Sequence, residues 1–150
     1  MNWFLLLKAF HVLSAVTAVG ANLTYAAWSA RAQREPNYLG FALRGIKFID
    51  DRIANPAYGV LLITGVLMGI FYLGFAHAWL IAGLSIYAVV AGMAAGVYSP
   101  ALTRQIAALE TGGVASTAYR AADARARAVG IVMGVMVIGA VFIMVIKPEV

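Results

Sequence analysis

The stretch that decides the fold is AVGIVMGVMVIGAVFIMVI, residues 128–146, which contains no charged side chain. A bilayer has a hydrocarbon core about 30 Å thick, and a helix of about 20 apolar residues crosses it. Lipid offers no partners to backbone amide and carbonyl groups, and an α-helix satisfies these groups within the segment itself. Residues 128–146 therefore predict a transmembrane helix.

Three further apolar segments precede it, at about residues 3–30, 53–76 and 78–103. The 150-residue chain is 63% hydrophobic and 11% charged, whereas about a quarter of the residues of a soluble domain are charged. The first span is too long for the core of a signal peptide and follows no basic segment, so we expect it to be retained. The sequence predicts an all-α integral membrane four-helix bundle that forms a single domain, residues 1–150.

Basic residues are concentrated in two of the three connections between these spans. Residues 75–79 join the second and third spans in a short turn without lysine or arginine. The connections 31–52 and 104–127 hold nine of the eleven basic residues, namely Arg31, Arg34, Arg44, Lys47, Arg52, Arg104, Arg120, Arg125 and Arg127. The positive-inside rule places both connections in the cytoplasm and both termini on the periplasmic side of a bacterial inner membrane. The spans then form two antiparallel helical hairpins.

Both long connections contain helical patterns. Residues 38–53 form an amphipathic run that leads into the second span, with Pro56 near the first turn, where proline is tolerated. Residues 118–128 are rich in alanine and arginine, so we expect the fourth helix to begin before the membrane, after a break at Thr111-Gly112-Gly113. Tyrosines and tryptophans near the inner surface suit an interfacial belt, namely Trp28, Tyr38, Tyr58 and Tyr98.

Small residues recur every four positions in each span, as at Gly65 and Gly69 in the second and at Ala88, Gly92 and Gly96 in the third. Such spacing lets helix backbones approach closely in lipid. We expect these stripes to be packing seams within the bundle. The alternative is that one of them forms a homodimer interface.

The composition excludes several classes of function. The chain has no cysteine, which excludes disulfides, thiol catalysis and iron–sulfur clusters. The predicted spans contain no carboxylate, which argues against a proton-coupled carrier built on acidic relays. The basic residues flank apolar spans, so they indicate a membrane surface rather than nucleic acid.

His11 is the candidate site residue, because it is the ionisable group predicted to lie deepest in a span. At about 100° per residue it shares one helix face with Ala15, Ala18, Asn22 and Tyr25, so we expect it to point into the bundle. A histidine there is either a hydrogen-bonded packing residue or a metal or cofactor ligand. Counting depth along the second span places Met68 level with His11, which would suit a His–Met haem or a five-coordinate haem. His77 is expected at the membrane edge.

One resemblance supports the ligand interpretation. Leu6-Leu7-Lys8-Ala9-Phe10-His11-Val12-Leu13 resembles the first helix of small bacterial membrane proteins of the HemJ and CopD type, and the ending Val145-Ile146-Lys147-Pro148 is similar to theirs. The chain looks closest to their uncharacterised branch. HemJ-type proteins bind haem b and act in protoporphyrinogen oxidation, and CopD is linked to copper handling. The resemblance implies His11 as a haem ligand.

Three hypotheses for the function remain open. The first is a redox or haem-handling membrane protein that binds haem b through His11, with Met68 as the candidate sixth ligand. The second is a non-catalytic small subunit that packs against a larger membrane complex or a second copy of itself. The third is a small-molecule permeation protein. All three require the lipid bilayer as a partner.

Overall fold

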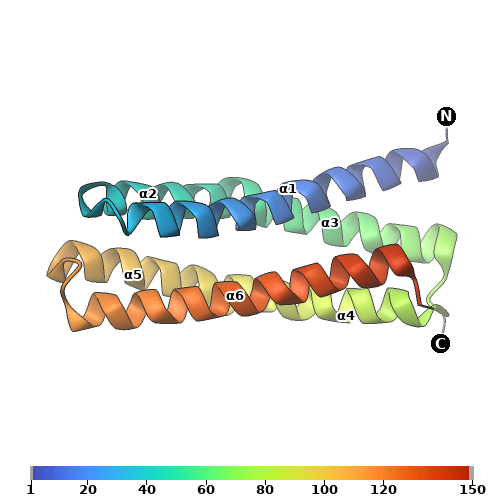
Figure 1. Cartoon of the computed structure of the whole chain (residues 1–150). Coiled ribbons are helices and arrows are strands. Elements are labelled where there is room, and N and C mark those ends of the chain that lie inside the picture. The colour runs from blue at the N-terminus through green and yellow to red at the C-terminus, as the bar shows by residue number, and fades with distance from the viewer. Residues whose placement is uncertain (1, 149–150) are drawn as a thin grey trace.

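The four apolar segments form four helical rods that run side by side (Figure 1). The computed structural model describes residues 2–148. In chain order it contains α1 (Trp3–Ala32), α2 (Pro36–Ile49), a π-helical turn η1 (Asp50–Ala54), α3 (Asn55–Met68), a second π-helical turn η2 (Gly69–Leu73), α4 (Ala78–Met93), a third one η3 (Ala94–Tyr98), α5 (Ser99–Gly112) and α6 (Thr117–Ile146). No strand occurs in these residues, which confirms the predicted all-α class.

All four rods are long and apolar enough to cross a membrane. The second rod runs without a break over Pro36–Leu73 and the third over Ala78–Gly112. The second has 38 residues, which at 1.5 Å per residue is about 57 Å. Since a hydrocarbon core is only about 30 Å thick, part of each of these rods extends beyond the membrane.

The two long connections are therefore mostly helical, and only short turns interrupt them. The predicted break near residue 113 is confirmed, because Gly113 adopts φ 71°, a left-handed conformation that favours glycine. The side chain of Ser116 then accepts a hydrogen bond from the Tyr119 amide at 3.1 Å and caps α6. Helix α6 begins well before its apolar segment, as predicted.

The prolines in the middle of two rods follow widened helical turns. Pro56 lies in the first turn of α3, as predicted, but α3 continues directly from α2. In the turn before it, the Asn55 amide bonds to the Asp50 carbonyl five residues back. The Ser99 amide bonds to the Ala94 carbonyl in the same way before Pro100. Proline lacks an amide donor and crowds the preceding turn, and the π-helical geometry accommodates this without ending the helix.

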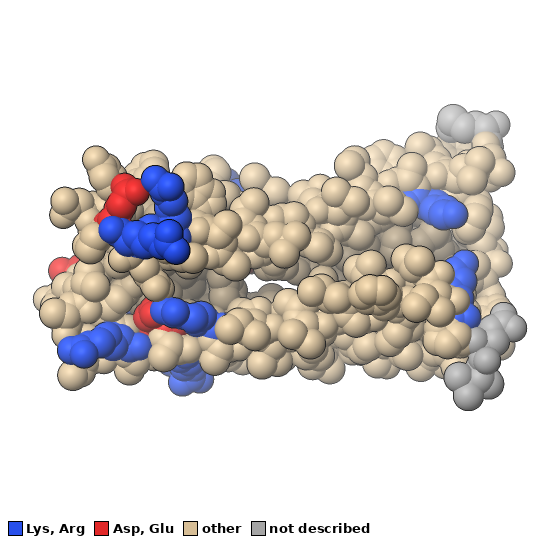
Figure 2. Space-filling view, in the orientation of Figure 1, with Lys and Arg blue, Asp and Glu red and all other residues tan. Residues whose placement is uncertain are grey.

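The rods pack as two hairpins, one of α1 with α2–α3 and the other of α4–α5 with α6 (Figure 1). The two turns after α1 and α5 lie at one end of the bundle, where most Lys and Arg side chains gather (Figure 2). We call this the basic end. The turn between α3 and α4 lies at the opposite end with the N-terminal start of α1 and the end of α6, and we call this the terminal end.

The main core lies toward the basic end. Leu39 and Leu43 of α2 and Leu102 of α5 are at most 2% exposed, and they belong to one cluster with Ala18, Ala21, Tyr25, Ala32, Ile46, Ala54, Ala57, Tyr58 and Tyr119. A smaller cluster of Val90, Ala94 and Met133 joins α4 to α6. Near the middle of the molecule, the space-filling view shows an opening between the two hairpins (Figure 2).

The predicted glycine seam is confirmed in one hairpin and wrong in the other. A Cβ built on Gly65 would lie 3.1 Å from Cε1 of His11, so this glycine lets α1 and α3 approach closely. In α4 and η3, by contrast, Gly92 and Gly96 are exposed and a Cβ on either meets nothing within 4 Å. The glycine that faces α6 is Gly83, where a Cβ would lie 2.1 Å from Met144 Cε.

Candidate functional site

His11 lies between α1 and α3 and is held by Thr64. Its Nδ1 is 3.0 Å from Thr64 Oγ1, and the same hydroxyl is 2.7 Å from the Val60 carbonyl oxygen. A threonine hydroxyl has one proton, which the carbonyl oxygen accepts here, so the hydroxyl oxygen is free to accept from the imidazole. We therefore assign the histidine proton to Nδ1, which leaves the lone pair of Nε2 available to a ligand.

The surroundings of His11 confirm that its helix face points inward. The ring rests against Gly65, and Ala18 and Tyr25 on the same face of α1 are 0% and 4% exposed. The predicted inward face of the first span is thus the face that α1 presents to α3. Because Gly65 has no side chain, the imidazole fits against α3 and stays within hydrogen-bond distance of Thr64.

Met68 lies in the same hairpin as His11. It is 8% exposed and follows Thr64 by four residues, so it lies about 6 Å further toward the terminal end on the same buried face of α3. The prediction that Met68 is level with His11 is therefore wrong by about one turn, because His11 packs against Thr64 and Gly65. Met136 of α6 instead packs against the cluster that joins α4 to α6. Met68 is therefore the methionine that shares the His11 helix pair.

His77 lies at the terminal end, as predicted, and not beside His11. It precedes α4, and its ring is 5.7 Å from that of Trp79. Nζ of Lys147, which directly follows α6, lies 5.1 Å from the centroid of the Trp79 ring. A cation over an aromatic face is stabilising, so this group ties the end of α6 to the start of α4.

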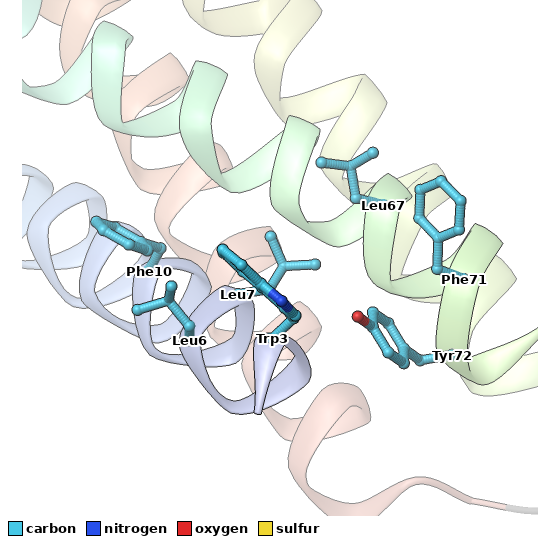
Figure 3. Close-up of a pocket in the computed structure, with 7 residues that line it drawn as sticks. All are labelled: Trp3, Leu6, Leu7, Phe10, Leu67, Phe71 and Tyr72. Carbon is cyan, nitrogen blue, oxygen red and sulfur yellow. The ribbon is translucent and has the colours of Figure 1, made fainter. Parts of the chain in front are cut away.

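An apolar groove of about 290 Å³ opens between α1 and α3 at the terminal end (Figure 3). Its lining residues are Trp3, Leu6, Leu7, Phe10, Leu67, Phe71 and Tyr72. Leu7 precedes His11 by one helical turn, and Leu67 follows Thr64 by three residues. The groove therefore begins one turn from the hydrogen-bonded pair, on the same two helices.

A second polar group lies nearer the basic end, and sequence analysis missed it. Asn22 Nδ2 donates to the Tyr58 hydroxyl, and the Tyr87 hydroxyl donates to the Tyr58 carbonyl oxygen. Tyr25 and Tyr98 stack across the two hairpins with ring centroids 6.3 Å apart. Tyr58 is 7% exposed and Tyr98 is half-buried, so the prediction that both belong to an interfacial belt is wrong. They face the junction of the hairpins instead.

Asp50 is the other residue that sequence analysis missed. It begins the π-helical turn η1 just before the predicted second span, and it is only 4% exposed. Its Oδ2 and the Tyr25 hydroxyl are both buried without a hydrogen-bond partner in the described part of the chain. Burial, together with the negative charge of Asp51, raises the pKa of Asp50 from 3.8 to about 6, against the opposing effects of Lys47 and of a side-chain hydrogen bond with Asn55. The only feature of the sequence that could have pointed to this turn is Pro56, six residues after Asp50.

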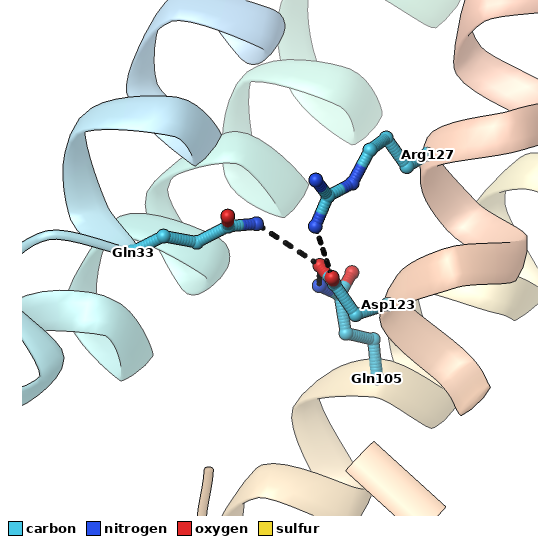
Figure 4. A network of polar contacts seen from close by, with 4 residues as sticks. All are labelled: Gln33, Gln105, Asp123 and Arg127. Carbon is cyan, nitrogen blue, oxygen red and sulfur yellow. Dashed lines mark hydrogen bonds and ion pairs between the residues drawn. The ribbon is translucent and has the colours of Figure 1, made fainter. Parts of the chain in front are cut away.

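A polar network closes the basic end (Figure 4). Asp123 Oδ1 of α6 accepts from Gln105 Nε2 of α5 at 2.8 Å and from Gln33 Nε2, just after α1, at 3.4 Å. Arg127 forms an ion pair with the other carboxylate oxygen. Because these residues come from both hairpins, the network holds the hairpins together.

The described residues gather no group of three or more His, Cys, Asp or Glu side chains that could hold a metal ion. A copper or zinc ion bound by side chains alone needs such a set. A haem needs only one or two axial ligands, because the porphyrin supplies the other four. The donor set around His11 fits a haem better than a bare metal ion.

Four long apolar rods, with their polar groups held between them, define a multi-pass integral membrane protein. The family model described as a predicted integral membrane protein (DUF2269) matches residues 5–148. The chain belongs to this family. No curated protein and no solved structure matches it.

Proposed function

We propose that this protein binds haem b, with Nε2 of His11 as the axial ligand. The observation that carries the proposal is the contact between His11 Nδ1 and the Thr64 hydroxyl, 3.0 Å long. A histidine that ligates a metal almost always donates its other N–H to a protein group, which fixes the tautomer and orients the ring. The bundle supplies such a partner to its one deeply placed histidine.

The surroundings of His11 support a flat apolar cofactor. The groove that begins one turn away is lined by apolar and aromatic side chains, which are the usual walls of a cofactor site. These residues would contact the porphyrin, and Met68 is our candidate for a sixth ligand. A bound haem iron supplies one-electron chemistry or a place for a small ligand, depending on whether the sixth position is filled. The HemJ-like first helix agrees with this proposal.

The orientation in the membrane belongs to the same proposal. The basic end faces the cytoplasm of a bacterial cell, and the terminal end faces the periplasm. This arrangement follows from the nine basic residues in connections 31–52 and 104–127, against Lys8 and Lys147 at the other end. His11 then lies in the half of the bilayer nearer the periplasm.

The test is the absorption spectrum of full-length protein purified in detergent from cells supplied with ample haem. The parent should show a Soret band, and His11→Ala should lose it while keeping its helix content. His77→Ala is the matched control and should keep the band. Thr64→Val should weaken haem affinity by about 10–100-fold, since it removes the partner of a ligand, whereas Thr17→Val, whose hydroxyl bonds only to its own helix, should not.

A parent protein without a Soret band defeats the haem proposal. The small-subunit function then becomes the better explanation, because α4 and η3 expose small residues at Ala88, Gly92 and Gly96, a spacing that suits contact with another transmembrane helix. Crosslinking at residue 92 in native membranes would identify that partner. A band that survives in His11→Ala means that haem is bound through another ligand.

A further inference from the structure

The junction of the two hairpins contains two buried polar atoms that lack partners. Asp50 and Tyr25 are each 4% exposed, and Asp50 Oδ2 and the Tyr25 hydroxyl make no hydrogen bond within residues 2–148. An unpaired polar atom in such a place costs about 1–3 kcal/mol. For Asp50 the cost is larger when the carboxyl group is charged.

The local backbone brings this region together. Asp50 starts η1, and Tyr98 ends η3 on the other hairpin, stacked on Tyr25. Each of these turns directly precedes a proline-containing helix start, and such π-helical turns are frequent at functional sites. Among the neighbouring charges, that of Asp50 acts most strongly on the Tyr25 hydroxyl.

The Asp50 carboxylate forms no ion pair with the described residues. The titratable groups that interact electrostatically with Asp50 are Tyr25 of α1, Lys47 of α2, Asp51 of η1, Tyr58 of α3 and Tyr98 of η3. Lys47 is the one cation among them, and its Nζ is already 2.5 Å from Asp51 Oδ1. A buried carboxylate without a paired cation is costly in its charged form.

We infer that Asp50 is a proton-binding site of this protein. A proton from water at the basic end forms an O–H bond at Oδ2, and the carboxylate becomes a neutral carboxylic acid. This one proton removes a buried charge that no paired cation neutralises.

A proton suits this site better than a metal ion. The Tyr58 hydroxyl and carbonyl oxygens already accept hydrogen bonds from Asn22 and Tyr87. That leaves Asp50 Oδ2 and the Tyr25 hydroxyl, whereas hard cations such as calcium or magnesium require about six oxygen ligands. The raised pKa of Asp50, about 6, agrees with a group that exchanges its proton near neutral pH.

This inference does not depend on haem binding. Tyr25 follows His11 by fourteen residues, which is about 21 Å along α1. Haem loading is read from visible absorption, whereas protonation of Asp50 is read from the infrared carboxyl band. Either result can fail without the other.

The experiment is infrared difference spectroscopy of the full-length protein in nanodiscs between pH 4.5 and 8. The parent should show a protonated-carboxyl band that titrates with a midpoint near pH 6. Asp50→Asn should lose the band. Asp51→Asn, its exposed neighbour, should keep the band with the midpoint moved to lower pH, because a repelling charge is removed. Tyr25→Phe, which retains the carboxyl, should keep the band.

Three outcomes overturn the inference. One is a parent without a carboxyl that titrates above the ordinary range. Another is a band that disappears in Asp51→Asn and not in Asp50→Asn. The third is a midpoint that falls when sodium chloride replaces choline chloride, since sodium rather than a proton would then be the ligand. If Asp50→Asn does not fold, the midpoint shift in Asp51→Asn decides the question.

Discussion

The basic half of the bundle is packed across both hairpins, whereas in the terminal half each hairpin packs mainly within itself. Leu43 and Leu102 are 1% and 2% exposed near the basic end, while Trp3 and Phe71 near the terminal end are 64% and 69% exposed. The Asp123 network also joins the hairpins at the basic end only (Figure 4).

The surroundings explain this difference. The second and third rods are too long for a bilayer, so their basic ends meet water, where burying apolar surface stabilises packing. Within lipid, helices gain little from apolar contact and rely on close fit and hydrogen bonds. The terminal half therefore holds together through specific contacts such as His11 with Thr64, and it has room for a groove. The comparison leads to four predictions.

The largest expected effect is in the core of the basic half. Leu43→Ala should lower the free energy of unfolding by about 2–5 kcal/mol, because it leaves a cavity in a fully buried site. Leu13→Ala is the matched control: Leu13 is 63% exposed in the apolar part of α1, and its loss should cost far less. Thermal unfolding in detergent measures both. Equal losses would mean that the two halves are packed alike.

Asp50 should make the stability of the basic half depend on pH. Its pKa is raised to about 6 on folding, so its contribution favours the folded state below about pH 4 and is lost as pH rises through 6. The shift corresponds to a difference on the order of 3 kcal/mol. Asp50→Asn should therefore gain stability relative to the parent at pH 8 and lose that advantage at pH 4.5. A pH-independent difference in melting temperature contradicts this assignment.

Close approach of α4 and α6 should matter in the terminal half. Gly83→Leu should destabilise the bundle by about 1–3 kcal/mol, because the added side chain overlaps Met144. Gly92→Leu adds the same atoms to an exposed face and should leave the melting temperature of the isolated chain unchanged. If Gly92→Leu is equally harmful, that face packs against another copy or another protein.

The smallest effect is expected on the outer surface of the basic half. Arg44 Nη1 and Glu110 Oε1 are 3.0 Å apart and link α2 to α5, but both side chains are more than half exposed. Exposed ion pairs contribute about 0–1 kcal/mol. Arg44→Gln should therefore shift the melting temperature only slightly, and even less in high salt. A large loss would show that charge, rather than the leucine core, joins the hairpins.

Sequence reasoning placed His11 correctly because α1 is regular over its whole length. A helix has a fixed angle per residue, so the face shared by His11, Ala18 and Tyr25 follows from spacing alone. The same reasoning failed for Gly92, because the orientation of α4 depends on which face contacts α6. Gly83 and Met144 decide that contact, and they are far apart in the chain.

The sequence by itself determined the four apolar helices, the break before α6 and the inward face of α1. These features depend on hydrophobicity, glycine conformation and helical periodicity, which act over a few residues or a single span. Only the tertiary structure decided that Thr64 holds His11, that α2 and α5 form the main core, and that Asp50 Oδ2 and the Tyr25 hydroxyl are buried without hydrogen-bond partners among residues 2–148. Each of these depends on side chains from different helices, and the packing of the two hairpins determines which of them meet.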